Sequence, residues 1–134
     1  MSNNYRKLHA LHNAKACTFL NDGKDFPDWV VTTAFYAALH FVQHEVFPAS
    51  MNNRNYLSFE NYYNGHYGGK QNKPNRHLST INLVYSEIGN DAGVIYEWLH
   101  DACRTARYRN FNTDPKISSA SIERLEELRT YFSK

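Results

Sequence analysis

The segment DFPDWVVTTAFYAALHFVQ, residues 25–43, decides the fold of this chain. Pro27 suits the first turn of an α-helix, where its missing amide hydrogen leaves no bond unmade, and Asp28 suits the positive end of the helix dipole. Pro48 stops the helix, because proline cannot continue it. Together these residues predict a helix over residues 27–47.

Apolar side chains cover more than half of the circumference of this predicted helix. One face follows the helical period and holds Val31, Phe35, Ala38, Leu39, Val42 and Val46. That face is widened by Val30, Ala34, Ala37 and Phe41. A helix that is apolar on most sides packs against several neighbours, so we predict that it is the central helix of the domain.

The rest of the chain is also helical in pattern, and no alternating strand pattern competes. We predict helices over residues 3–21, 76–88 and 91–109 and a last one that begins near Thr113-Asp114-Pro115, with Asp91 as a helix cap. The inner face of the first helix is expected to hold Tyr5, Leu8, Leu11 and Phe19. The inner face of the helix over residues 76–88 is expected to hold Ile81, Val84, Tyr85 and Ile88. For the helix over residues 91–109 the expected residues are Ile95, Leu99, Ala102, Cys103 and Ala106, and for the last helix they are Ile122, Leu125, Leu128 and Phe132. The predicted fold class is all-α, an antiparallel bundle of about five helices.

Residues 48–75 form a long polar segment, rich in Asn, Tyr and Gly, that interrupts the helical pattern. We predict a loop between the second and third helices, because no periodicity persists, and loops this long are usually functional or disordered. Its aromatic and basic residues are Tyr56, Phe59, Tyr62, Tyr63, Tyr67, Lys70, Lys73 and Arg76. Such residues can stack on bases and hold phosphates. In the alternative interpretation, the rings fold back onto the bundle or onto a partner subunit.

The composition bounds the class of protein. The chain has 134 residues, 42% of them hydrophobic and 15% aromatic, with a formal charge of +2. These values predict one globular domain and exclude membrane, collagen-like, disulfide-scaffold and disordered classes. Cys17 and Cys103 lie far apart without a CxxC pattern, as expected for buried thiols in a reducing compartment. With no membrane span and no signal-peptide core, we expect a soluble, cytoplasmic protein.

Two polar stripes are the candidate functional residues. Tyr36, His40 and His44 are spaced four residues apart, and Thr33 adjoins them on the predicted central helix. A second stripe, on the helix predicted over residues 91–109, holds His100, Arg104 and Arg107, flanked by Tyr96 and Glu97. If the two helices pack antiparallel, both stripes line one groove. Arginine forks bind phosphate and histidine moves protons near neutral pH, so the groove suits phosphodiester binding or metal-free RNA cleavage through the 2′-hydroxyl.

The same residues also allow interpretations without a functional site. Tyr36 and His40 can be satisfied polar groups of the core, and Arg104, Arg107 and Arg109 can be a solvated basic face near a helix end. His40 and His44 have the spacing of a metal-binding pair, but their stripe has no carboxylate and there is no HExxH pattern, so we expect no metal. The segment GHYGGKQNK lacks the ending of a phosphate-binding loop, and no cofactor is expected.

The run at residues 25–43, together with Arg104-Thr105-Ala106-Arg107-Tyr108, resembles the HEPN superfamily (higher eukaryotes and prokaryotes nucleotide-binding domain). Small prokaryotic members show a similar D-W-A-V-T…F-Y-A-A-L-H run, a variable loop, and then a helix that ends in R-x-x-A-R-Y. The resemblance implies an all-α bundle, commonly a homodimer. It also implies either a metal-independent endoribonuclease of toxin–antitoxin, antiphage or CRISPR systems, or a noncatalytic module that binds nucleotide or RNA.

The chain departs from the R-x(4–6)-H motif of the nuclease members. No histidine follows Arg104, Arg107 or Arg109, and the only match in spacing, Arg6 to His12, lies on the first helix. We therefore predict a HEPN-like module that binds RNA, a nucleotide or a protein partner such as an antitoxin, without cleavage. The alternatives are a divergent endoribonuclease, in which His66 or His77 could assist, and a structural dimerising subunit. The predicted catalytic residues are His40 and Arg104, and the predicted ligand-binding residues are Tyr36, His44, His77, His100, Arg107 and Tyr108.

Overall fold

The computed structural model describes residues 4–132, in which six α-helices, one π-helical segment and one β-hairpin follow each other. Their order is α1 (Asn4–Gly23), α2 (Pro27–Val46), β1 (Ala49–Met51), β2 (Arg54–Tyr56), α3 (Phe59–Tyr67), α4 (Arg76–Leu83), η1 (Val84–Ile88), α5 (Asn90–Tyr108) and α6 (Pro115–Arg129). The predicted all-α bundle is confirmed. The prediction of about five helices agrees with the six observed, and the additional helix, α3, lies in the segment predicted to be a loop.

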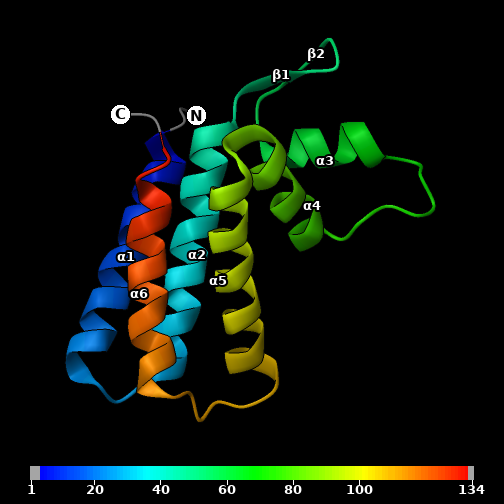
Figure 1. The fold of residues 1–134 in the computed structure, drawn as a ribbon. Coiled ribbons are helices and arrows are strands. Elements are labelled where there is room, and N and C mark those ends of the chain that lie inside the picture. Colours follow the sequence, from blue (N-terminus) through cyan, green and yellow to red (C-terminus); the bar gives the residue numbers. More distant parts are fainter. Residues whose placement is uncertain (1–3, 133–134) are drawn as a thin grey trace.

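Four helices, α1, α2, α5 and α6, form the bundle and run alternately in opposite directions (Figure 1). Helix α2 packs against each of the other three. Its buried residues lie on several sides, including Val31, Phe35 and Phe41. The prediction of a central helix is therefore confirmed, as is the antiparallel packing of α2 against α5 that a shared groove requires.

The inner face of α1 differs from the prediction. Tyr5, Leu8 and Phe19 are exposed to 58%, 64% and 78%, whereas Ala10 and Cys17 are buried. Small side chains on the buried face allow the backbones of α1 and α2 to approach closely, and the larger residues are turned to solvent. The prediction that Tyr5, Leu8 and Phe19 pack in the core is wrong, while Leu11 does lie against the core as expected.

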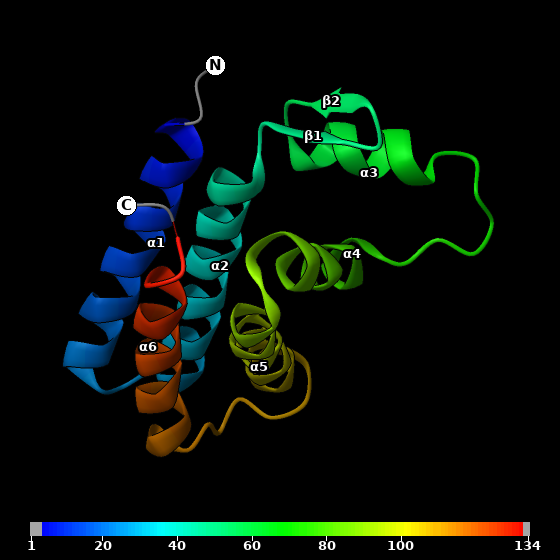
Figure 2. The same cartoon turned by 45° about the horizontal axis from the view of Figure 1, so that its top comes forward.

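The predicted loop over residues 48–75 is largely ordered structure that projects to one side of the bundle (Figure 2). It starts with the hairpin β1–β2, in which Ala49 pairs with Tyr56. The turn consists of Asn52 and Asn53, both with positive φ, as the tight turn of a two-residue hairpin demands. Helix α3 follows, and the Ser58 side chain caps it by accepting a hydrogen bond from the Asn61 amide.

The aromatic rings of this segment fold back rather than face solvent. Tyr56, Phe59, Tyr62 and Tyr63 are all buried and form a ring cluster with Phe47 at the end of α2. This arrangement agrees with the packing interpretation of the loop.

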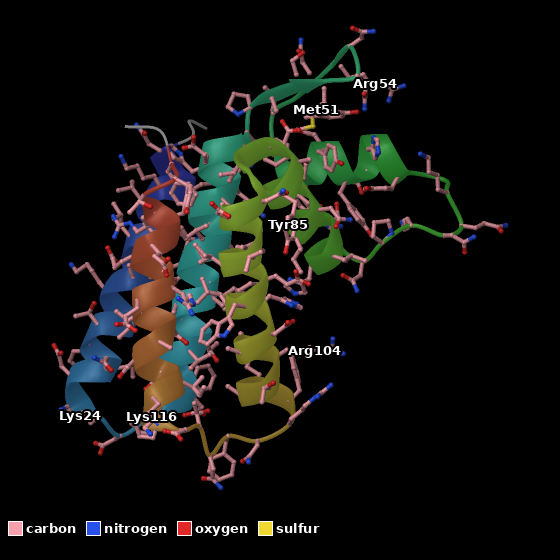
Figure 3. The ribbon with its side chains drawn as sticks, in the orientation of Figure 1. Lys24, Met51, Arg54, Tyr85, Arg104 and Lys116 are labelled. Atoms are coloured by element: carbon pink, nitrogen blue, oxygen red, sulfur yellow. The ribbon has the colours of Figure 1, made fainter. Side chains whose placement is uncertain are left out.

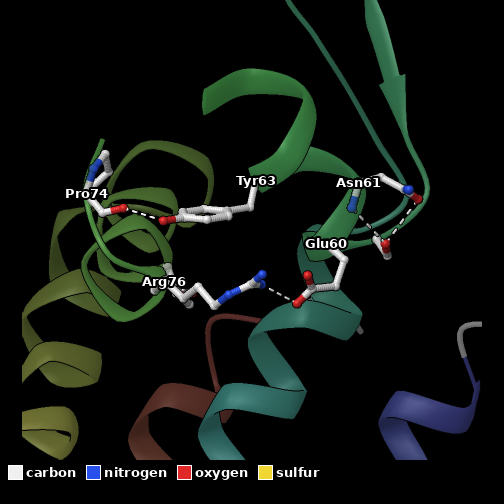
Figure 4. A network of polar contacts seen from close by, with 7 residues as sticks. Glu60, Asn61, Tyr63, Pro74 and Arg76 are labelled. Carbon is white, nitrogen blue, oxygen red and sulfur yellow. Dashed lines mark hydrogen bonds and ion pairs between the residues drawn. The ribbon is translucent and has the colours of Figure 1, made fainter. Parts of the chain in front are cut away.

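Two polar contacts tie α3 to the start of α4 (Figure 4). The Tyr63 hydroxyl donates a hydrogen bond to the Pro74 carbonyl at 2.6 Å, and the Arg76 guanidinium pairs with the Glu60 carboxylate. The guanidinium of Arg76 also lies over the Tyr63 ring, 4.8 Å from its centroid. These contacts fix where the chain re-enters the bundle and so position the first turn of α4.

The helix predicted over residues 76–88 is observed as α4 followed by η1, which ends at Gly89 with a φ of 147°. Helix α5 begins one residue earlier than predicted, with Gly89 rather than Asp91 at the cap position. Glycine at position 93 allows the Tyr85 ring of η1 to lie close against α5, because a Cβ atom at this position would lie 2.4 Å from that ring. The Tyr85 hydroxyl in turn donates to the Glu97 carboxylate at 2.8 Å.

Helix α6 begins as predicted, at Pro115, and the Asp114 side chain caps it by accepting from the Lys116 amide. Among the helices of residues 4–132, none combines the length and the apolar character that crossing a membrane requires.

Candidate functional site

A cavity of about 420 Å³ lies between α2, α4 and α5, and we call it the α4–α5 cavity. It is lined by Phe35, Tyr36, Asn75, His77, Leu78, Ile81, Glu97, His100, Asp101, Cys103, Arg104, Arg107 and Tyr108. Six of the eight predicted site residues are therefore brought together around it, and they come from three separate helices. Its volume lies within the range of small-molecule sites, about 300–1,000 Å³.

The arginines come from one stripe of α5, because residues at i and i+3 share a helix face. Arg107 faces α2, and its Nη1 donates a hydrogen bond to the Tyr36 hydroxyl at 2.6 Å. Its guanidinium also lies 5.1 Å from the centroid of the Tyr108 ring. Arg104 is exposed and extends from α5 at the mouth of the cavity (Figure 3). Within residues 4–132, neither arginine forms an ion pair with a carboxylate.

Two imidazoles, His77 from α4 and His100 from α5, also line the cavity. The ring centroids of His77 and His100 are 5.2 Å apart, and both rings lie against Phe35. Loss of hydration beside the cavity lowers the pKa of His77, and the neighbouring His100 and Arg107 lower it further. His77 is therefore neutral at pH 7 and can accept a proton or a hydrogen bond.

The carboxylates of the cavity are already engaged with neighbours. Glu97 accepts from Tyr85, and the Asp101 Oδ1 lies 3.2 Å from the His100 Nδ1. Both precede Arg104 and Arg107 along α5, so the lining carries carboxylates and guanidiniums on successive turns of one helix. A ligand that has both hydroxyl or amino donors and an anion matches this lining.

The structure does not bring His40 and Arg104 together around one cavity. His40 lines a second cavity, also of about 420 Å³, on the α1 side of α2. There its ring stacks on His9 with the centroids 3.7 Å apart. Burial, and then the neighbouring His9 and Arg6, lower the pKa of His40 to about 4. A neutral imidazole packed on another ring resembles a structural group more than a catalytic partner of Arg104.

His44 lies farther along α2 and lines neither of these two cavities. No group of three or more His, Cys, Asp or Glu side chains in the described part of the chain is arranged to hold a metal ion. Both cysteines are buried with free thiols, and burial raises the pKa of each.

Sequence reasoning missed Asn75, Asp101, His9 and Trp29 as cavity residues. Asn75 had a detectable pattern, because it caps α4 by accepting a hydrogen bond from the Leu78 amide, and asparagine is a preferred cap. His9 and Trp29 had none, since their meeting depends on how α1 crosses α2.

Comparisons of the chain with protein-family models, with curated proteins and with solved structures gave no match.

Proposed function

We propose that this protein is a HEPN-like module that binds a nucleotide unit of RNA in the α4–α5 cavity without cleaving it. The observation that carries the proposal is the placement of Arg104 and Arg107, free of ion pairs in the described part of the chain, beside a wall of aromatic and imidazole rings. The resemblance of residues 25–43 to the superfamily supports the same function.

The chemistry of each wall fits one part of a nucleotide. The guanidiniums of Arg104 and Arg107 offer forked donors that match phosphate oxygens. The rings of Tyr108 and His77 supply surfaces on which a base can stack. The carboxylate of Asp101 can accept a hydrogen bond from a ribose hydroxyl, a group that distinguishes RNA from DNA.

Binding can be tested by titrating the protein with fluorescein-labelled single-stranded RNA and following the anisotropy. We expect Arg104→Ala and Arg107→Ala each to weaken binding about tenfold and to reduce its salt dependence. Arg54→Ala is the matched control, because Arg54 is an exposed arginine on the hairpin, remote from the cavity (Figure 3). Equal affinities in all three variants would remove the cavity from the binding site.

A second candidate function is metal-independent cleavage of RNA, and the pair of imidazoles next to Arg104 favours it. In such a reaction neutral His77 would take the proton of a 2′-hydroxyl, whose oxygen attacks the phosphorus. His100, when protonated, would give a proton to the departing 5′-oxygen, while Arg104 would stabilise the charged phosphate.

This second candidate is tested by incubating the protein with labelled RNA in EDTA. Cleavage that is lost in His77→Ala and in His100→Ala would support it, and intact RNA at high protein concentration would exclude it. The homodimer implied by the resemblance stays a prediction, which analytical ultracentrifugation tests.

A further inference from the structure

The second cavity lies directly beside the α4–α5 cavity, and the two share Tyr36 and Arg107 as lining residues. We propose that this second cavity, the α1–α2 subsite, holds the base of an adjoining nucleotide, so that the protein binds two consecutive nucleotides of single-stranded RNA. The inference rests on the proposed function of the α4–α5 cavity and extends it across α2.

The shared residues form the boundary between the two cavities. Arg107 uses Nη1 to donate to the Tyr36 hydroxyl, which leaves further N–H groups of the guanidinium for a ligand. A phosphate bound to Arg107 at this boundary has one cavity on each side. In a nucleic acid strand, a phosphate likewise has one nucleoside on each side.

The lining of the α1–α2 subsite suits the neighbourhood of a phosphate. It includes the guanidinium of Arg107 and the imidazoles of His9 and His40, the latter neutral, and it has no carboxylate among the described residues. Arg6 is close enough for its positive charge to act on His40. The carboxylates Glu97 and Asp101 line only the α4–α5 cavity, so an anion is best placed at Arg107, where the two cavities meet.

Trp29 gives the subsite a surface for a base. It lines the cavity and is 50% exposed, although most large apolar residues of α2 are buried in the bundle. Packing of the core therefore does not explain this indole. Stacking on an aromatic side chain accepts any base, and its loss weakens binding about tenfold or more per base.

The experiment compares uridine 5′-monophosphate with the dinucleotide pUpU, by calorimetry and by Trp29 fluorescence. Trp98 is the other tryptophan of the chain and lies under Arg124 on the α6 side of α5, so Trp98→Phe leaves Trp29 as the single reporter. We expect pUpU to bind about tenfold more tightly than the mononucleotide and to quench Trp29. Trp29→Ala should remove this advantage of pUpU and leave mononucleotide binding unchanged, whereas Arg104→Ala should weaken both.

The outcomes separate this inference from the proposed function. Mononucleotide binding that depends on Arg104, with no gain for pUpU and no effect of Trp29→Ala, would overturn the subsite and leave the proposed function standing. Failure of both ligands to bind would overturn the proposed function and the subsite with it.

Calorimetry on the chain with both tryptophans repeats the comparison without Trp98→Phe. If stacking is the cause, Trp29→Phe should recover part of the pUpU advantage that Trp29→Ala removes. Equal binding of the deoxy dinucleotide would keep the subsite but overturn its assignment to RNA, because the ribose hydroxyls would then contribute nothing.

Discussion

His40 should make the stability of this protein depend on pH, and His40→Gln should remove that dependence. Burial, and then the neighbouring His9 and Arg6, lower the pKa of His40 from 6.5 to about 4, so the folded protein keeps the ring neutral where the unfolded chain protonates it. Between these two pH values the unfolded state binds more protons than the native state, and stability therefore rises with pH. The contribution is complete above about pH 6.5 and is lost as the pH falls toward 4.

The magnitude follows from the linkage of protonation to folding. A pKa depressed from 6.5 to about 4 corresponds to a loss of about 1.8 kcal/mol in the free energy of unfolding between pH 7 and pH 5. The ring of His40 is partly exposed, so solvent screening reduces the expected loss to about 1 kcal/mol. Glutamine stays uncharged over this range and should flatten the profile by the same amount.

Urea unfolding followed by circular dichroism at about pH 5 and about pH 7 measures this difference, since other titrating groups are common to both proteins. His12→Gln, at an exposed position on α1, is the control, and the contribution of His40 should persist in it. Identical pH profiles for the parent protein and His40→Gln would refute the argument that burial beside His9 and Arg6 keeps His40 neutral.

Three further changes test the packing of the fold, each by urea unfolding. Gly93→Ala should lower the free energy of unfolding by about 1–3 kcal/mol, because the new Cβ would overlap the Tyr85 ring. The control Gly23→Ala places its Cβ in open space and should change the free energy of unfolding by less than about 0.5 kcal/mol. Equal effects of the two substitutions would contradict the close approach of α5 and η1. Leu99→Ala should lower the free energy of unfolding by about 2–5 kcal/mol, since Leu99 is fully buried. The control Leu8→Ala, at an exposed site, should lower it by less than about 0.5 kcal/mol. A large effect at Leu8 would instead support the predicted inner face of α1. Asp114→Ala should cost about 0.5–2 kcal/mol by removing the cap of α6, and an unchanged free energy of unfolding would show that the hydrogen bond to the Lys116 amide contributes nothing.

Much of the fold could be predicted because local chemistry decides it. Pro27 and Pro48 bound α2, Pro115 opens α6, and the apolar periodicity of α2 indicates a central helix. The face of α1 could not be predicted in this way, because small buried residues such as Ala10 carry less apolar weight than the exposed Leu8. Which face of a helix is buried depends on how closely its neighbour approaches, and that is a tertiary property.

The candidate site, like the fold, was predictable where helical geometry alone groups the residues and not where tertiary packing does. His100, Arg104 and Arg107 share a face of α5 by helical geometry alone, so their grouping was predictable. The pairing of His40 with Arg104 was not, because four residues along a helix advance about 6 Å and turn the side chain by about 40°. That turn is enough to carry His40 out of the α4–α5 cavity and toward His9 on α1, in the second cavity that Tyr36 also lines.

The small inner face of α1 has a consequence for local stability. Ala10 and Cys17 are the fully buried residues of this helix, Leu11, Ala14 and Leu20 are partly buried, and its packing is mainly against α2. A helix with few fully buried side chains and one main neighbour opens at a lower free energy than the rest of the domain, so the amides of α1 should exchange with deuterium before those of α2 and α5. Because α1 supplies His9 and Asn13 to the second cavity, each such opening dismantles that cavity while the α4–α5 cavity stays whole.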